Sequence, residues 1–193
     1  MNPTLFFAVR LPASSCAQLE PYLAGLAGIS PAIRPVRADG LHLTLQFLGR
    51  VSSESVAALL KVGAAVASDR PRFTIELGEL GSFESGHRPT VIWIGLRRGA
   101  DELAGLNREL GTRLAAARLP QDRRGFRPHL TLARVKGELG ETAFAQVAGL
   151  GARLRAAEFE PLPVTEIHLM ESEPVPGEPN RYRSREALAL RLL

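Results

Sequence analysis

The sequence contains almost no cysteine, very little lysine and no long apolar run. Cys16 is the single cysteine among 193 residues, so an intrachain disulfide is excluded and a reducing cytoplasm is the expected location. No segment approaches the roughly 18 consecutive apolar residues of a membrane-spanning helix. The apolar start, Leu5 to Val9, is too short for a secretion signal, and Arg10 interrupts it. We therefore expect a cytoplasmic protein without membrane contact.

Several motifs of common enzyme classes are also missing. There is no GxxxxGK or GxGxxG phosphate loop and no GxSxG elbow of a serine hydrolase. No cysteine pair or HExxH spacing favours zinc, although a metal site made from His42, His129 and either His87 or His168 stays open as an alternative. These absences lead us to expect chemistry without a cofactor or metal.

The basic residues are almost entirely arginine. Lysine and arginine together number 24, with Lys61 and Lys136 as the lysines, against 20 acidic residues; the net charge is +4 and the pI is about 10.0. Arginine makes bidentate contacts with phosphate, so this balance is compatible with an anionic partner. The composition of the source genome explains the bias equally well.

One four-residue string, HLTL, occurs at residues 42–45 and again at residues 129–132. Side chains alternate between the faces of a strand, so each copy sets its His and Thr side by side while its two Leu point into the core. A lone His-x-Thr is usually the polar face of an ordinary strand. Two copies at equivalent places in a duplicated chain favour one joint active site.

The elements around the two strings follow the same order. Apolar alternation and helical spacing predict a strand at 5–11, a helix to about 26, a loop at 29–40, a strand at 41–48, a helix to about 67 and a strand at 73–77. The order repeats as a strand at 90–96, a helix from 101, a strand to about 135, a helix from 140–142 and a strand at 164–170, with a final strand within 182–192. This predicts an internally duplicated domain over residues 1–193 with a pseudo-two-fold axis between the motifs and a lobe junction at Gly81–Pro89.

Two histidines and two hydroxyls suit displacement at a phosphodiester. Histidine titrates near neutral pH, so one copy can take a proton from the attacking oxygen while the other gives a proton to the leaving oxygen. Hydroxyl donors such as Thr44 and Thr131 would stabilise the charge on the non-bridging oxygens. Arg134, at the end of the second strand, would add a cationic clamp.

Other residues carry weaker signals. We expect His87 to be a solvated loop residue and Trp93 to belong to the core. We expect His168 to lie at the rim of the groove or at the surface, on the same strand face as Glu166. An arginine cluster precedes the second motif and would attract a polyanion, or is simply a solvated loop. The cluster consists of Arg123, Arg124 and Arg127. Of these we assign Arg127 to the expected site, together with Phe47 and Tyr182, which would line the groove.

Four segments together resemble one known family. LFFAVRLP at 5–12, LHLTLQFLG at 41–49, FRPHLTLAR at 126–134 and LMES at 169–172 resemble the 2H phosphoesterase superfamily, and within it the bacterial and archaeal RNA 2′,3′-cyclic phosphodiesterases, also called 2′-5′ RNA ligases. The resemblance implies an α+β, bilobal fold of two halves, each with an antiparallel sheet and outer helices, and a metal-free active-site cleft between them. One departure is Pro35, where relatives often carry a Trp before the first motif.

The resemblance also implies an activity and roles. It implies hydrolysis of RNA or nucleoside 2′,3′-cyclic phosphates to 2′-phosphates, with His129 as the proton acceptor and His42 as the proton donor. Separately, we expect the protein to be a monomer. Thr44 and Thr131 would hold the phosphate oxygens, and 2′-5′ ligation of RNA would be the reverse reaction. Two alternatives stay open: a module that binds RNA ends without turnover, and a related enzyme for ADP-ribose 1″,2″-cyclic phosphate.

Overall fold

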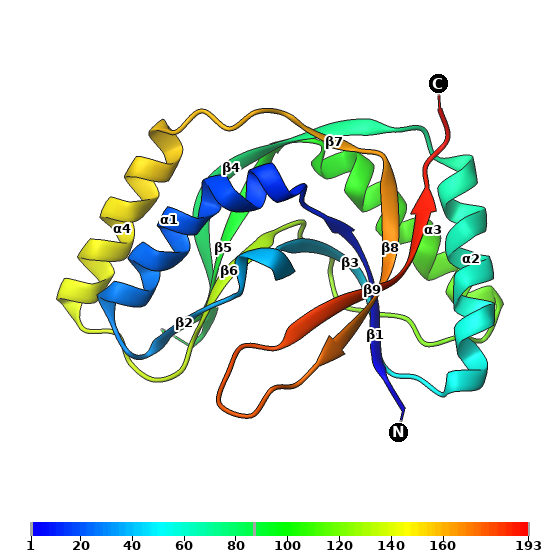
Figure 1. Ribbon diagram of the computed structural model, residues 1–193, viewed down its shortest axis with the longest axis horizontal. Coiled ribbons are helices and arrows are strands. Elements are labelled where there is room, and N and C mark those ends of the chain that lie inside the picture. Colours follow the sequence, from blue (N-terminus) through cyan, green and yellow to red (C-terminus); the bar gives the residue numbers. More distant parts are fainter. Residues whose placement is uncertain (1, 87, 193) are drawn as a thin grey trace.

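The computed structural model describes residues 2–86 and 88–192, and it is an α+β structure in which helices flank a curved antiparallel sheet (Figure 1). The helices are α1 (Ala13–Ile29), α2 (Val56–Asp69), α3 (Ala100–Ala116) and α4 (Glu141–Ala156), with short 3₁₀ turns η1 (Ala38–Gly40) and η2 (Ser53–Ser55). The strands are β1 (Thr4–Arg10), β2 (Ile33–Pro35), β3 (His42–Arg50), β4 (Phe73–Ser85), β5 (Arg88–Arg98), β6 (Leu130–Val135), β7 (Leu162–Val164), β8 (Glu166–Glu173) and β9 (Arg181–Ala189). No helix within these described ranges is long and apolar enough to cross a membrane.

The sheet consists of two half-sheets that meet at a single residue pair. The strand order is β7-β4-β5-β6-β3-β1-β8-β9, with β2 paired to β6. We call β3, β1, β8 and β9 the first half-sheet and the remaining strands the second half-sheet. They join where Leu43 of β3 pairs with Leu130 of β6. These two leucines are equivalent positions of the two HLTL strings, so the expected two-fold relation between the copies is confirmed at the join.

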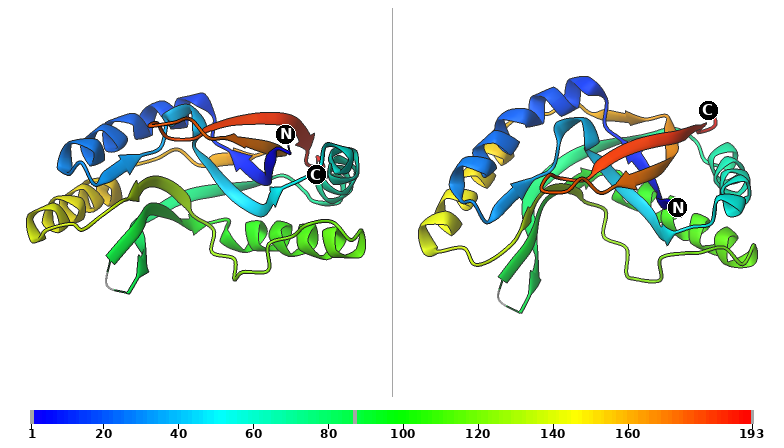
Figure 2. Two further views of the ribbon diagram at one scale, coloured as in Figure 1. Left: turned by 90° about the horizontal axis from the view of Figure 1, so that it is seen from below. Right: turned by 60° about the horizontal axis from the view of Figure 1, so that its bottom comes forward.

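The two repeats exchange their last strands. β4 ends the first repeat in the chain but pairs with β5 of the second, and β8 ends the second repeat but pairs with β1 of the first. Figure 2 shows the two layers that result. The segment Gly81–Pro89 marks the change from the first repeat to the second, but it is not a connection between two lobes as expected: Gly81 and Pro89 lie in the neighbouring strands β4 and β5, which form an antiparallel pair. The exchange makes each half-sheet depend on both repeats.

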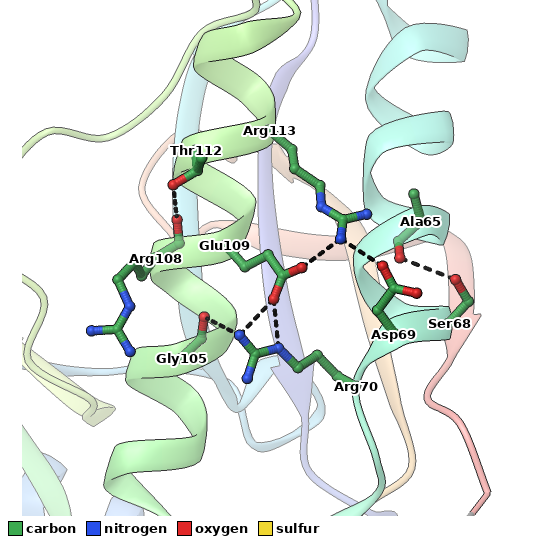
Figure 3. A network of polar contacts seen from close by, with 9 residues as sticks. All are labelled: Ala65, Ser68, Asp69, Arg70, Gly105, Arg108, Glu109, Thr112 and Arg113. Carbon is green, nitrogen blue, oxygen red and sulfur yellow. Dashed lines mark hydrogen bonds and ion pairs between the residues drawn. The ribbon is translucent and has the colours of Figure 1, made fainter.

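The helices pack in pairs that also join the two repeats. Helix α1 lies beside α4 at one side of the sheet, and α2 lies beside α3 at the other (Figures 1 and 2). A polar network holds the second pair together (Figure 3). Glu109 of α3 accepts a 2.6 Å hydrogen bond from Arg70 Nε, and Arg113 pairs with both Glu109 and Asp69. Because Glu109 is mostly shielded from solvent, this network is less screened than a surface ion pair.

The buried residues confirm most of the core faces that the spacing of apolar residues predicts. In α1 the buried large residues are Leu19, Leu23 and Leu26, the face that the helical period predicts. Helix α4 is buried only in its C-terminal half. Its buried residues are Leu150, Gly151 and Leu154, while Phe144 near its start is 45% exposed. The sequence alone could not show which part of this helix lies against β4.

Two segments differ from the elements that the sequence predicts. The expected loop at 29–40 contains β2, whose pairing with β6 depends on a distant segment and leaves no local pattern. The expected strand at 164–170 is interrupted at Thr165, because the chain leaves β4 there and joins β1 and β9 in the other half-sheet. Both differences follow from strand pairing over long sequence distances.

Candidate active site

The two HLTL strings lie next to each other at the join between the half-sheets. His42 is the first residue of β3, and His129 directly precedes β6. All four leucines of the strings are at most 2% exposed, whereas the histidines and threonines are partly exposed. The alternation of strand side chains thus places both His/Thr pairs on the open side of the sheet, as the pattern predicts.

Both imidazoles are held in the same way. The Nδ1–H group of His42 donates to the carbonyl oxygen of Gly40 at 2.6 Å, and that of His129 donates to the carbonyl oxygen of Arg127 at 2.7 Å. Because a carbonyl oxygen can only accept, Nδ1 carries the proton in each ring. In a neutral ring Nε2 is then an unprotonated acceptor, and no described residue hydrogen-bonds to it. Each histidine therefore has one nitrogen available for proton transfer.

Aromatic rings surround each histidine. The rings of Phe6 and Tyr182 lie 4.9 Å and 4.7 Å from that of His42, measured between centroids. The rings of Phe83 and Trp93 lie 4.7 Å and 6.3 Å from that of His129. Gly40 permits the close approach of Tyr182, because a Cβ atom at position 40 would lie 3.0 Å from Tyr182 Cδ2.

These surroundings lower the pKa of both imidazole rings. Burial, which penalises the charged imidazolium, lowers the pKa of His42 to about 4, and the hydrogen bond to Gly40 opposes this only in part. Burial likewise lowers the pKa of His129, with the Arg127 and Arg134 guanidinium groups acting in the same direction. With a pKa of about 4, the His42 ring is neutral at neutral pH before an anion binds.

One pocket with a volume of about 480 Å³ contains both histidines. All eight residues that sequence analysis assigned to the site line this pocket: His42, Thr44, Phe47, Arg127, His129, Thr131, Arg134 and Tyr182. Two threonine hydroxyls and two imidazoles thus share one space with cationic side chains. This space can hold a phosphate-sized anion between two proton-transfer groups.

Phe47 reaches the pocket because β3 is irregular. The pairing of β1 with β3 passes from Phe7↔Gln46 to Ala8↔Thr44, so Leu45 is an extra residue in β3. Such a bulge reverses the faces of the residues that follow it. Phe47 is consequently 42% exposed and lines the pocket, while Gln46 is turned inward and is 2% exposed.

The inward Gln46 is one of the residues that sequence analysis missed. Its Nε2 donates to the carbonyl oxygen of Asn107, and its Oε1 accepts from the backbone N–H of Asp122. Asn107 Nδ2 in turn donates to the carbonyl oxygen of Leu45 at 2.6 Å. These bonds tie α3 and the loop before β6 to the first motif. A glutamine inside an apolar strand was the available signal, but its partners lie far away in the sequence.

The three arginines of the cluster before the second motif lie in three different environments. The Arg127 guanidinium lies over Phe83 and Trp93, 5.3 Å and 5.4 Å from the ring centroids. Arg124 lines the pocket but is paired with Asp122. Arg123 is exposed and does not line the pocket. The cluster as a whole is therefore not one binding surface.

Two further expectations about single residues are wrong, and a third concerns a residue that the structure does not describe. Trp93 is not a core residue: its ring is partly exposed, packs beside Phe83 and His129 and lies under the Arg127 guanidinium, because the β-strand face it occupies borders the site. His168 is 6% exposed rather than superficial, since β8 is an inner strand between β1 and β9, where His168 pairs with Glu166 at 3.1 Å and with Ser184 at 2.9 Å. His168 does not line the pocket. His87 lies outside the described residues.

A duplicated α+β fold with one His-x-Thr pair in each half defines the class of two-histidine phosphoesterases. The model of the 2′-5′ RNA ligase superfamily matches residues 14–175, and the chain belongs to this family.

Individual relatives agree with this membership. The chain is 42% identical over 106 residues to an RNA 2′,3′-cyclic phosphodiesterase of Aeropyrum pernix, an alignment that spans 54% of the chain and 58% of that relative. It is 38% identical over 135 residues to an RNA 2′,3′-cyclic phosphodiesterase of Escherichia coli strain K12, which covers 69% of the chain and 73% of that relative. A crystal structure of E. coli LigT complexed with 3′-AMP superimposes with a TM-score of 0.72 at 31% identity, covering 98% of this chain and 99% of that one.

Proposed function

We propose that this protein hydrolyses the 2′,3′-cyclic phosphate at the end of an RNA, or of a nucleoside, to a 2′-phosphate. The observation that carries the proposal is the pair of imidazoles in one pocket, each with Nδ1 bound to a carbonyl and Nε2 available. A site of this kind suits a reaction in which one oxygen must lose a proton and another must gain one. The family and the names of the relatives support the same reaction.

In the proposed reaction His129 Nε2 takes a proton from a water molecule as the water oxygen attacks phosphorus. The bond between phosphorus and the 3′ oxygen breaks on the opposite side, and His42 gives its proton to that oxygen. The product carries a phosphate on the 2′ oxygen, and a proton returns from His129 to His42 through solvent. Thr44 and Thr131 donate hydrogen bonds to the non-bridging oxygens, and Arg134 opposes their charge.

The acid role of His42 requires a proton that the ring lacks in the free protein, because its pKa is lowered to about 4. An anionic phosphate beside the ring favours the imidazolium and so supplies the proton together with the substrate. A strongly desolvated acid of this kind also gives up its proton readily to the leaving oxygen. The assignment of acid and base to these two copies follows the family resemblance.

The chain by itself supplies every residue of the proposed site, and we propose that it works as a monomer. We also propose a cytoplasmic location, which suits the free and buried thiol of Cys16. The 2′-5′ joining of RNA would follow the same ring opening, with an RNA 5′ hydroxyl in place of water as the nucleophile.

The test measures conversion of cytidine 2′,3′-cyclic phosphate in EDTA by ³¹P NMR. We expect cytidine 2′-phosphate from the wild-type protein, and at least a 10²-fold loss of kcat in His42→Ala and in His129→Ala. The matched control is His168→Ala, which removes an imidazole outside the pocket, with folding of each variant checked by thermal unfolding. Binding without turnover in the wild-type protein would favour the RNA-end-binding module. Full activity in either pocket variant contradicts the two-histidine mechanism.

A further inference from the structure

A second groove of about 410 Å³ opens beside the active-site pocket. It lies between β2, the end of β6 and the segment that connects β8 to β9, and it shares Val36, Arg134 and Tyr182 with the pocket. Because the two spaces adjoin, a molecule bound in the pocket can extend directly into this groove. The residues that line the groove are Arg34, Pro35, Val36, Arg134, Lys136, Val175, Gly177, Glu178, Pro179, Asn180 and Tyr182.

Cations gather along one wall of this groove. Arg34 of β2 lies directly opposite Arg134 of β6, and Lys136 follows two positions later, where its backbone N–H continues the pairing to Ala32. Among the described residues, none of these three cations has a carboxylate partner. The lining carboxylate Glu178 is 54% exposed and lies 3.8 Å from Arg181.

Like charges directly opposite each other destabilise a strand pair. Two other arginines near the site do have acidic partners, Arg37 with Asp39 and Arg124 with Asp122. An unneutralised row of cations that leads out of a phosphate site is the arrangement expected for a polyanion that continues beyond the reacting phosphate.

The position of Tyr182 indicates which end of the RNA would enter the groove. Tyr182 lies against His42, the residue proposed to protonate the leaving 3′ oxygen, and it lines both spaces. The ribose that carries the cyclic phosphate would thus lie on the His42 side of the phosphorus. The chain that continues from the 5′ oxygen of this ribose then has the groove in front of it.

We propose that Arg34 and Lys136 form a subsite for the phosphodiester backbone on the 5′ side of the terminal nucleoside. This inference rests on the proposed function, and it makes the end of an RNA chain a better substrate than a nucleoside cyclic phosphate. Among the described residues that line the groove, Tyr182 is the one aromatic side chain, and it already packs against His42. The groove would therefore contact the phosphates of the RNA backbone and would not stack the bases. Binding at this subsite would not depend on the base sequence.

The experiment compares a groove variant, Arg34→Gln/Lys136→Gln, with a control that removes the same two charges elsewhere. The control is Arg50→Gln/Lys61→Gln, because Arg50 lies at the end of β3 away from His42 and Lys61 is exposed on α2. Each protein is assayed with a tetranucleotide that ends in a 2′,3′-cyclic phosphate and with cytidine 2′,3′-cyclic phosphate. All of the substituted side chains are exposed, so the fold is retained.

We expect the groove variant to lose about 10-fold in kcat/KM on the tetranucleotide, mainly through KM, and to keep its wild-type rate on the nucleoside substrate. The slope of log Kd against log salt for the tetranucleotide should fall by about 1.4, since two phosphate contacts are removed. The control should match the wild type on both substrates. Equal losses on both substrates, or equal losses in groove variant and control, overturn the subsite.

Binding of a tetranucleotide that ends in a 2′-phosphate separates this inference from the proposed function. This measurement needs no turnover, so it decides the subsite even if the wild-type protein hydrolyses neither substrate. Weaker binding to the groove variant than to the control supports the subsite. Equal binding to both, together with normal hydrolysis by the wild type, rejects the subsite and leaves the proposed function intact.

Discussion

An anion bound in the active-site pocket should protonate His42. In the free protein burial lowers the pKa of this residue to about 4, so its ring is neutral at pH 7. The proposed acid role requires the imidazolium, and the charges of His129, Arg134 and Arg10 act against it, because each lowers the pKa of His42 further. The bound anion must therefore supply the charge that favours the proton.

The size of this effect follows from Coulomb's law. An anionic oxygen in contact with Nε2 lies about 4 Å from the centre of positive charge, and at an effective dielectric constant of about 20 one unit of charge contributes roughly 4 kcal/mol. This energy corresponds to a factor of about 10³ in the protonation equilibrium. A ring with a pKa of about 4 in the free protein would then titrate in the neutral range when the anion is bound.

The assay is a histidine-specific NMR titration in saturating sulfate and in chloride of the same ionic strength. Sulfate is suitable because it stays a dianion throughout the titration. We expect the midpoint of His42 to rise in sulfate, whereas His168, which lies outside the pocket, should respond equally in both salts. Saturable sulfate binding that leaves the His42 midpoint unchanged would refute the reasoning, because His42 could then not enter the reaction as an acid.

Two further predictions follow from the same side chains. Thr44→Val and Thr131→Val keep the side-chain shape but remove the hydroxyl donors, so each should lower kcat by about 10²-fold with little change in thermal stability; an unchanged kcat contradicts their role in stabilising the phosphate oxygens. The pKa of His42 is about 6.5 when unfolded and about 4 when folded, so the unfolded state binds the proton more readily between these values. Stability is therefore lost as the pH falls from about 6.5 to 4, by on the order of 3 kcal/mol from this residue. The loss should be smaller in His42→Asn when urea unfolding is measured across this range, and equal pH dependence in both proteins would count against a strongly desolvated ring.

Some of the site was readable from local sequence. The HLTL strings placed their leucines in the core and their histidines and threonines on the open face, because strand side chains alternate whatever their partners are. Phe47 breaks this rule, since the bulge at Leu45 depends on how β3 pairs with β1. Gln46 and Asn107 were missed for the same reason, as their hydrogen bonds join segments more than 60 positions apart.

The amino-acid sequence by itself determined the duplicated order of elements, the faces of most strands and helices, and the two His/Thr pairs. These features depend on the period of a strand or helix and on residues close together in the chain. Tertiary structure alone decided that the repeats exchange their last strands, that aromatic rings from β1, β4, β5 and β9 desolvate the histidines, and that Arg34 lies opposite Arg134. Each of these depends on contacts between distant segments, whose energies come from burial and pairing rather than from any local pattern.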